Sequence, residues 1–185
     1  MRKHAPTSVP PEQFTIGVLP PPTFSNSQWY GSRFHGSPVV QIAFNVIPHG
    51  GDFTDNGYTT EEMKLVWETR KILGDDSIRV NATVVRVPVF YGHSEAVNVE
   101  TRDKLSAADA RKLLENAPGV EVVDEPVGGG YPTPVTHASG SDPVYVGRIR
   151  DDISHPRGLN LWIVSDNIRK GAALNTVTVV SSLRQ

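Results

Sequence analysis

Residues 85–97 restrict the fold of this chain more than any other stretch. They read VRVPVFYGHSEAV, with β-branched residues on both sides of a Tyr-Gly pair. This pattern is typical of strand segments separated by a turn. We expect one or two strands in residues 78–90 and another in residues 94–100. The domain must therefore contain a β-sheet, with a histidine placed where the chain turns.

Other stretches predict helices. Thr59 precedes Glu62 by three positions, which is the capping-box pattern. Mainly apolar residues then recur with the period of a helix until Gly74. We therefore expect a helix over residues 60–73. Ser106 predicts the start of a second helix that ends near residues 117–119. Ser165 predicts the cap of a last helix over residues 166–175.

The remaining apolar runs predict strands over residues 39–47, 120–123, 144–150 and 159–164, and residues 128–140 predict a loop. Strands outnumber helices and do not alternate regularly with them. The fold class is therefore α+β, with a mixed, largely antiparallel sheet and helices packed on one face. The proline-rich residues 1–38 predict a poorly ordered leader or, alternatively, an arm that packs through its aromatic residues, and residues 39–185 predict the folded domain.

Composition excludes several function classes. The 185 residues carry a formal net charge of −2, so no basic field favours nucleic acid. No apolar run approaches the roughly 20 residues that span a bilayer, and no signal-peptide core follows the N-terminus. We expect a cytoplasmic chain without nucleic-acid or membrane partners.

The sequence also limits the cofactors that the chain binds by itself. It contains no cysteine, which excludes disulfides and thiolate ligands, and its histidines show no metal-ligand spacing, so we expect no metal. It contains no GxGxxG fingerprint, so we expect no dinucleotide-binding domain within it. The glycine run at residues 128–130 is not followed by the Lys-Ser/Thr of a phosphate loop.

Four side chains could carry chemistry. Arg86 lies among apolar residues, where it could grip a carboxylate through its fork or pair with an acidic residue of its own domain. His93 follows the predicted turn, where an imidazole could transfer protons or simply lie at the surface. Glu61 and Lys64 share one helix face, either as a solvated ion pair or as ligands for a charged substrate.

An ordered set of motifs supports a functional interpretation of these residues. The motifs are IAFNVIPH at residues 42–49, NGYTTEEMK at 56–64, WETRKIL at 67–73, the run at 86–97, YPTP at 131–134, VGRIR at 146–150, GLNLW at 158–162 and KGAALN at 170–175. Over roughly residues 40–180 the chain resembles bacterial aspartate-semialdehyde dehydrogenases. The resemblance is to their C-terminal catalytic and dimerisation domain, which is similar to its counterpart in glyceraldehyde-3-phosphate dehydrogenase.

The resemblance implies an activity. Members of the family use NADPH to reduce L-aspartyl-4-phosphate to L-aspartate 4-semialdehyde, in aspartate-family amino-acid biosynthesis. A cysteine thiolate attacks the acyl phosphate and a histidine handles the protons. By position, the resemblance makes His93 the acid/base residue and Arg86 the ligand of the substrate α-carboxylate. It makes Glu61 the ligand of the amine, Lys64 that of the phosphate, and Asn167 a contact of the nicotinamide.

The sequence also departs from the family. It contains neither the family's nucleotide-binding domain nor its nucleophile motif. We therefore expect an aspartate-semialdehyde dehydrogenase fragment that is inactive alone, with NADP as the cofactor of the whole enzyme. It would form a homodimer or pair with a full-length subunit. The alternatives are a non-catalytic association module and a split enzyme whose other polypeptide supplies the nucleotide domain.

Overall fold

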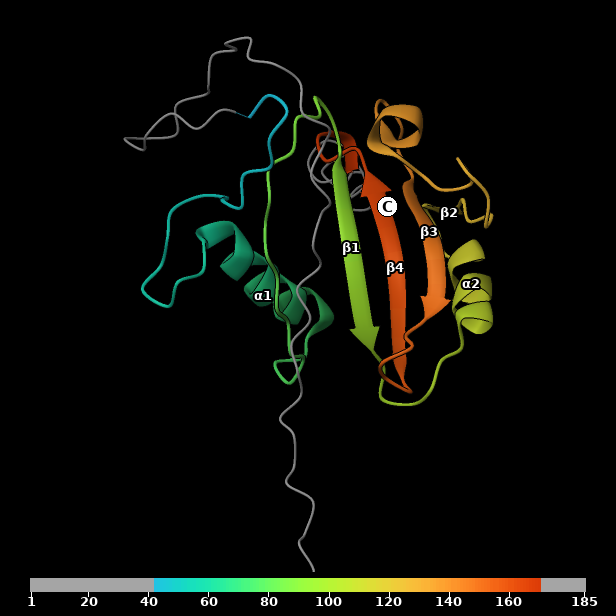
Figure 1. The fold of residues 1–185 in the computed structure, drawn as a ribbon. Coiled ribbons are helices and arrows are strands. Elements are labelled where there is room, and N and C mark those ends of the chain that lie inside the picture. Colours follow the sequence, from blue (N-terminus) through green and yellow to red (C-terminus); the bar gives the residue numbers. More distant parts are fainter. Residues whose placement is uncertain (1–41, 171–185) are drawn as a thin grey trace, which may run out of the picture.

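The computed structural model describes residues 42–170 of the chain. These residues form a four-stranded mixed sheet whose strands lie in the order β1-β4-β3-β2 (Figure 1). Strand β4 pairs antiparallel with β1 and β3, and β2 pairs parallel with β3. The α+β class and the largely antiparallel sheet are therefore confirmed. The elements are α1 (Thr60–Leu73), β1 (His93–Glu100), α2 (Ala107–Glu115), β2 (Val120–Val122), η1 (Pro134–Ala138), β3 (Val144–Asp151) and β4 (Gly158–Ser165).

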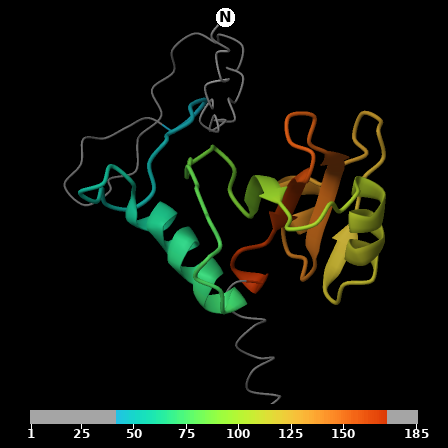
Figure 2. The same cartoon turned by 90° about the horizontal axis from the view of Figure 1, so that it is seen from below.

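The core lies between the sheet and α2, which packs on one sheet face. Ala110 of α2 is buried against Val146, Ile149 and Leu159 of the two central strands. On the opposite face, a smaller cluster joins Tyr145 and Val164 to the short π-helical element η1. Figures 1 and 2 show α2 against the sheet, whereas α1 lies to the side, beyond the edge strand β1.

Helix α1 forms where its sequence signals predict it. The hydroxyl of Thr59 accepts a hydrogen bond from the N–H of Glu62, and the carboxylate of Glu62 accepts one from the N–H of Thr59, which completes the capping box. Gly74 ends the helix with a left-handed φ of 66°, a conformation that costs glycine little. Helix α2 also begins at its predicted cap, Ser106.

Two predicted strands do not form within the described residues. In the run 39–47, of which residues 42–47 are described, Phe44 adopts a φ of 58° and the N–H of Asn45 donates to Ile42 O, so the chain turns. In the run 78–90 only Arg86 forms a bridge, to Ile47. Pro88 has no N–H to donate, and the turn before Ile47 prevents the ladder from continuing.

The loop 128–140 is more structured than its composition predicts. Within it, Pro134–Ala138 forms the π-helical turn η1, capped by the hydroxyl of Thr133, which accepts from the N–H of Thr136. The indole of Trp162 on β4 donates to Pro132 O at 2.9 Å. The loop is thereby fixed against one end of the sheet, next to the predicted site.

The structure describes only part of the segments predicted at the two ends of the chain. The predicted leader, residues 1–38, and residues 171–175 of the predicted last helix lie outside the described residues. In the described half of that predicted helix, residues 167–168 form a turn and not the start of an α-helix. Within residues 42–170, neither helix has the length and apolar character that crossing a membrane requires.

Candidate functional site

The start of α1 presents an acid–base pair to solvent. The ammonium of Lys64 lies 2.8 Å from the carboxylate of Glu61, one helical turn apart. Their side chains are 51% and 42% exposed, so the pair adds little stability, and both groups are open to a ligand. The hydrogen bond and charge of Glu61 raise the pKa of Lys64. The predicted shared face of these two residues is confirmed.

The segment that carries Arg86 is attached to this end of α1. The backbone of Arg86 exchanges two hydrogen bonds with Ile47, at 2.8 and 3.0 Å. Two residues earlier, the N–H of Val84 donates to the carboxylate of Glu62 at 2.9 Å. Gly50 fills the space between the segments, because a Cβ there would lie 2.8 Å from Val84 Cγ1 and 3.4 Å from Glu61 Cβ. Arg86 is half-buried at this junction.

His93 is the first residue of the edge strand β1 and follows the segment that carries Arg86. It pairs with Ser165, the last residue of β4, and its side chain is exposed. Gly92, just before it, has a φ of 84°, and a Cβ there would lie 3.1 Å from Ser165 O and 3.3 Å from Pro134 Cβ. The sharp turn at Gly92 therefore sets where the imidazole leaves the sheet.

A buried carboxylate organises the end of β4. Asp166 is only 6% exposed, and its side chain accepts hydrogen bonds from the N–H groups of Gly140, Ile168 and Arg169 at 2.9, 3.0 and 3.1 Å. The amides of Gly140 and Arg169 contribute most to lowering the pKa of Asp166. Asp166 therefore caps the turn that follows, in place of the predicted Ser165, and the next residue, Asn167, is exposed.

The structure arranges the predicted residues in two groups. Glu61, Lys64 and the Arg86 segment meet at the start of α1. His93, the first residue of β1, pairs with Ser165 at the end of β4, and Asn167 follows two residues later. Residues 87–92 connect the groups. The roles of these five residues remain predictions.

Two buried acids, Glu62 in the first group and Asp166 next to the second, fix backbone segments there and are not among the predicted site residues. The capping box signals only the local hydrogen bonds of Glu62, and an aspartate after a strand signals only a cap for Asp166. Neither pattern reveals the contact with a distant loop.

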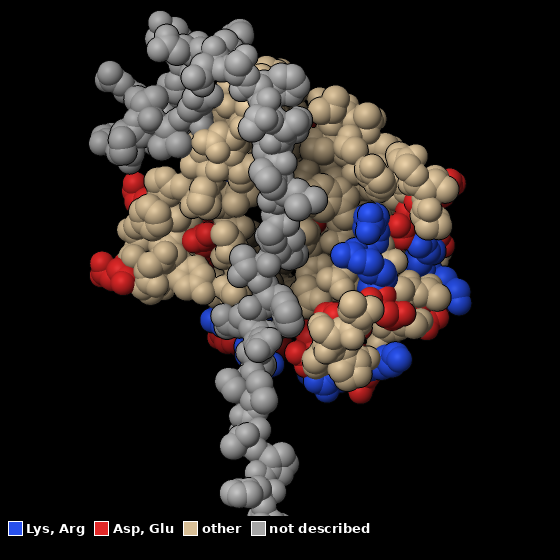
Figure 3. Space-filling view, viewed as in Figure 1, with Lys and Arg blue, Asp and Glu red and all other residues tan. Residues whose placement is uncertain are grey.

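The charged surface of the domain is mixed in sign. On the face seen in Figure 3, Lys and Arg side chains gather toward the side of β3 and α2, with Asp and Glu side chains among them. An ion pair joins Arg111 of α2 to Asp124, whose carboxylate also accepts from the N–H groups of Arg148 and Ile149 at the β3 bulge. Within the described residues, no cluster of three or more potential metal ligands occurs.

Comparison with known proteins identifies the kind of domain. Residues 31–170 match the family model of the semialdehyde dehydrogenase dimerisation domain, which defines the class of this α+β domain. The chain belongs to the semialdehyde dehydrogenase family. Its relatives include the aspartate-semialdehyde dehydrogenase of Legionella pneumophila, which is 64% identical over 161 residues that make up 84% of this chain and 46% of the relative.

Solved structures share the fold. Aspartate-semialdehyde dehydrogenase II of Vibrio cholerae, crystallised in complex with ASA, aligns with a TM-score of 0.74 and 56% identity over 77% of this chain and 41% of that one. The Candida albicans enzyme with NADP aligns with a TM-score of 0.55 and 27% identity over 70% and 41% of the two chains. The chain thus spans less than half the length of the curated relatives it matches.

Proposed function

We propose that this chain supplies the substrate-binding and proton-transferring half of an aspartate-semialdehyde dehydrogenase active site. The observation that carries the proposal is the junction at the start of α1. There, Arg86 is attached by backbone hydrogen bonds beside an exposed acid–base pair. The side chains that this junction carries, a guanidinium, an ammonium and a carboxylate, suit a substrate with a carboxylate, a phosphate and an amine.

Each residue has a role that fits its surroundings. Arg86 binds the α-carboxylate with its planar fork, Glu61 binds the α-ammonium, and Lys64 binds the phosphate once the substrate separates the ion pair. His93, exposed at the strand start, exchanges protons with the reacting group. Asn167, exposed after the buried Asp166, would lie near the nicotinamide of NADP, and the bound cofactor would supply the hydride chemistry.

The nucleophile must come from another polypeptide segment. The family's reaction starts from a thiolate, and these 185 residues contain no cysteine. The chain therefore orients the substrate and transfers protons, while another segment supplies the cysteine thiolate.

Ligand binding tests the substrate half directly. We expect L-aspartate, which carries the same α-amino and α-carboxylate groups, to shift the NMR signals of Arg86 and Glu61 in the full chain. Arg86→Ala should abolish these shifts. Arg79→Ala removes an exposed arginine from the preceding segment and is the matched control. Equal binding by wild type and Arg86→Ala would contradict the assignment of Arg86.

Complementation tests the chemistry. The part of the Legionella pneumophila relative that precedes its match to this chain is mixed with the full chain, and NADPH formation from aspartate semialdehyde and phosphate is recorded. We expect activity only in the mixture, and none with His93→Ala. NADPH formation by the chain alone, linear in protein and lost in His93→Ala, would contradict the proposal.

The second candidate function is a non-catalytic association module. It is favoured by one observation, the match of residues 31–170 to a dimerisation domain. In this role the sheet surface matters and His93 does not. The two candidates differ in whether L-aspartate binds.

A further inference from the structure

Glu62 holds two parts of the chain with one carboxylate. The side chain is buried, with 7% of the residue exposed, between the predicted ligands of α1 and the segment that carries Arg86. Oε2 accepts a hydrogen bond from the N–H of Thr59 at 2.7 Å, and Oε1 accepts one from the N–H of Val84 at 2.9 Å. Both oxygens are therefore used, each by a different segment.

The capping box explains only one of these two bonds. A capping box needs a single acceptor at this position, which glutamine supplies as well as glutamate. Only a carboxylate offers two equivalent acceptors to two amide donors. The bond to Val84 is therefore a separate feature, and it lies two residues before Arg86.

We propose that Glu62 is a positioning residue that sets the Arg86 guanidinium at a fixed place relative to Glu61 and Lys64. The inference rests on the proposed function, because it concerns the three residues assigned there to the substrate. Glu62 neighbours Glu61 on α1, so the bond that fixes Val84 also fixes the helix positions of the ligands. Together with the backbone bonds of Arg86 to Ile47, this side chain then sets the distance between the carboxylate-binding and amine-binding groups.

Packing and electrostatics agree with this role. Gly50 brings its backbone against Val84 and Glu61, so three segments pack closely next to Glu62. Burial alone would raise the pKa of Glu62. The N–H groups of Thr59 and Val84, with the Thr59 hydroxyl and the nearby His49, lower it below its ordinary value. Glu62 therefore stays ionised, and both acceptors persist, near neutral pH.

Three variants separate positioning from capping and from charge. Glu62→Gln keeps one acceptor and loses the second. Thr59→Ala removes the hydroxyl of the capping box but leaves the bond to Val84. Glu68→Gln removes an equal charge from an exposed position of the same helix. Val84→Pro deletes the donor without touching Glu62, and serves if Glu62→Gln does not fold.

Two measurements on the full chain decide the outcome. In Glu62→Gln we expect the N–H of Val84 to lose its protection from hydrogen exchange, and L-aspartate to bind about tenfold more weakly, which corresponds to about 1.4 kcal/mol. Thr59→Ala and Glu68→Gln should keep Val84 protection and bind within about twofold of wild type. Val84→Pro should weaken binding as Glu62→Gln does.

The two proposals fail in different ways. Unchanged Val84 protection or unchanged L-aspartate affinity in a folded Glu62→Gln variant would overturn the positioning role. Absence of L-aspartate binding by the wild-type chain would instead overturn the proposed function, whatever the exchange of Val84 shows.

Discussion

At the scale of single residues, largely buried carboxylates fix the loops of this domain. Glu62, Asp124 and Asp166 each accept hydrogen bonds from backbone N–H groups that no strand or helix uses. Hydrogen bonds to a charged acceptor are stronger than neutral ones, and a buried amide left unpaired is costly. These acids therefore stabilise loop segments and the bulge of β3, where the backbone lacks a regular partner.

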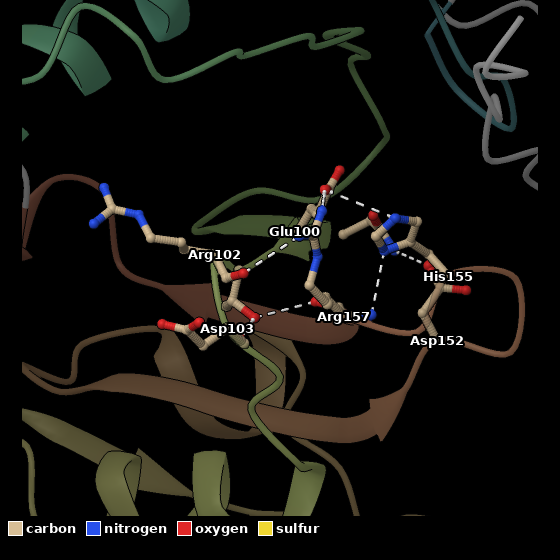
Figure 4. A network of polar contacts seen from close by, with 8 residues as sticks. Glu100, Arg102, Asp103, Asp152, His155 and Arg157 are labelled. Carbon is tan, nitrogen blue, oxygen red and sulfur yellow. Dashed lines mark hydrogen bonds and ion pairs between the residues drawn. The ribbon is translucent and has the colours of Figure 1, made fainter.

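A further carboxylate gives a pH prediction. At the β3–β4 turn, Asp152 accepts bonds from the hydroxyl and N–H of Ser154 and from the amide of Asn98, which lower its pKa from 3.8 to about 2. Figure 4 shows this turn beside the network in which Glu100 pairs with Arg157 and His155.

The sign of the effect follows from the depressed pKa. Asp152 stabilises the folded state above pH 3.8, and this stabilisation is lost as the pH falls from 3.8 toward about 2. Asp152→Asn should therefore unfold at lower urea than wild type at neutral pH, with the difference shrinking across that window. The exposed Asp76→Asn is the control for charge alone. A difference that grows on acidification would contradict the assignment.

Gly92 yields a prediction about the backbone before His93. Its φ of 84° is unfavourable for a residue with a Cβ, and an added Cβ would press on Ser165 O at 3.1 Å. Gly92→Ala should therefore destabilise the domain by about 1–2 kcal/mol, measured by urea unfolding. Gly128→Ala, where an added Cβ meets nothing within 4 Å, should change stability little. Equal stability of the two variants would count against the left-handed turn at Gly92.

At the scale of elements, local signals define helix α1 fully but do not suffice for the predicted strand at residues 78–90. Helix α1 carries its own cap and stop in Thr59, Glu62 and Gly74, so neighbouring residues suffice to define it. A strand also needs a partner, which the sequence does not show. Residues 78–90 have the β-branched composition of a strand, yet the amide of Val84 goes to a side chain and only Arg86 pairs.

Hydrogen exchange checks this irregular segment. We expect slow exchange for the N–H groups of Val84 and Arg86, which donate to Glu62 and to Ile47 O. The N–H groups of Val85 and Val87 have no partner within residues 42–170, so they should exchange rapidly. Regularly alternating protection that extends through residues 78–90 would mean that the segment is a strand paired with residues outside the described range.

At the scale of the whole molecule, the site depends on contacts that no short motif contains. The motif at 86–97 contains both Arg86 and His93. The helix spacing predicts that Glu61 and Lys64 share one face. Their assembly depends on Glu62 reaching Val84 and on His93 pairing with Ser165. Such long-range contacts depend on how the chain packs, which short motifs do not show. The motifs therefore identify the residues, and the structure shows how they are arranged.

The final prediction separates association from chemistry in the intact chain. The domain matches a dimerisation domain, and its strand β1 is exposed at nearly every position, which leaves a sheet surface for a second copy. We expect the purified chain to self-associate in light scattering. The double variant Arg86→Ala with His93→Ala should associate as wild type does, because Arg86 lies outside the four-stranded sheet and His93 is only the first residue of β1. Loss of association in a folded double variant would mean that the candidate site and the interface share these residues.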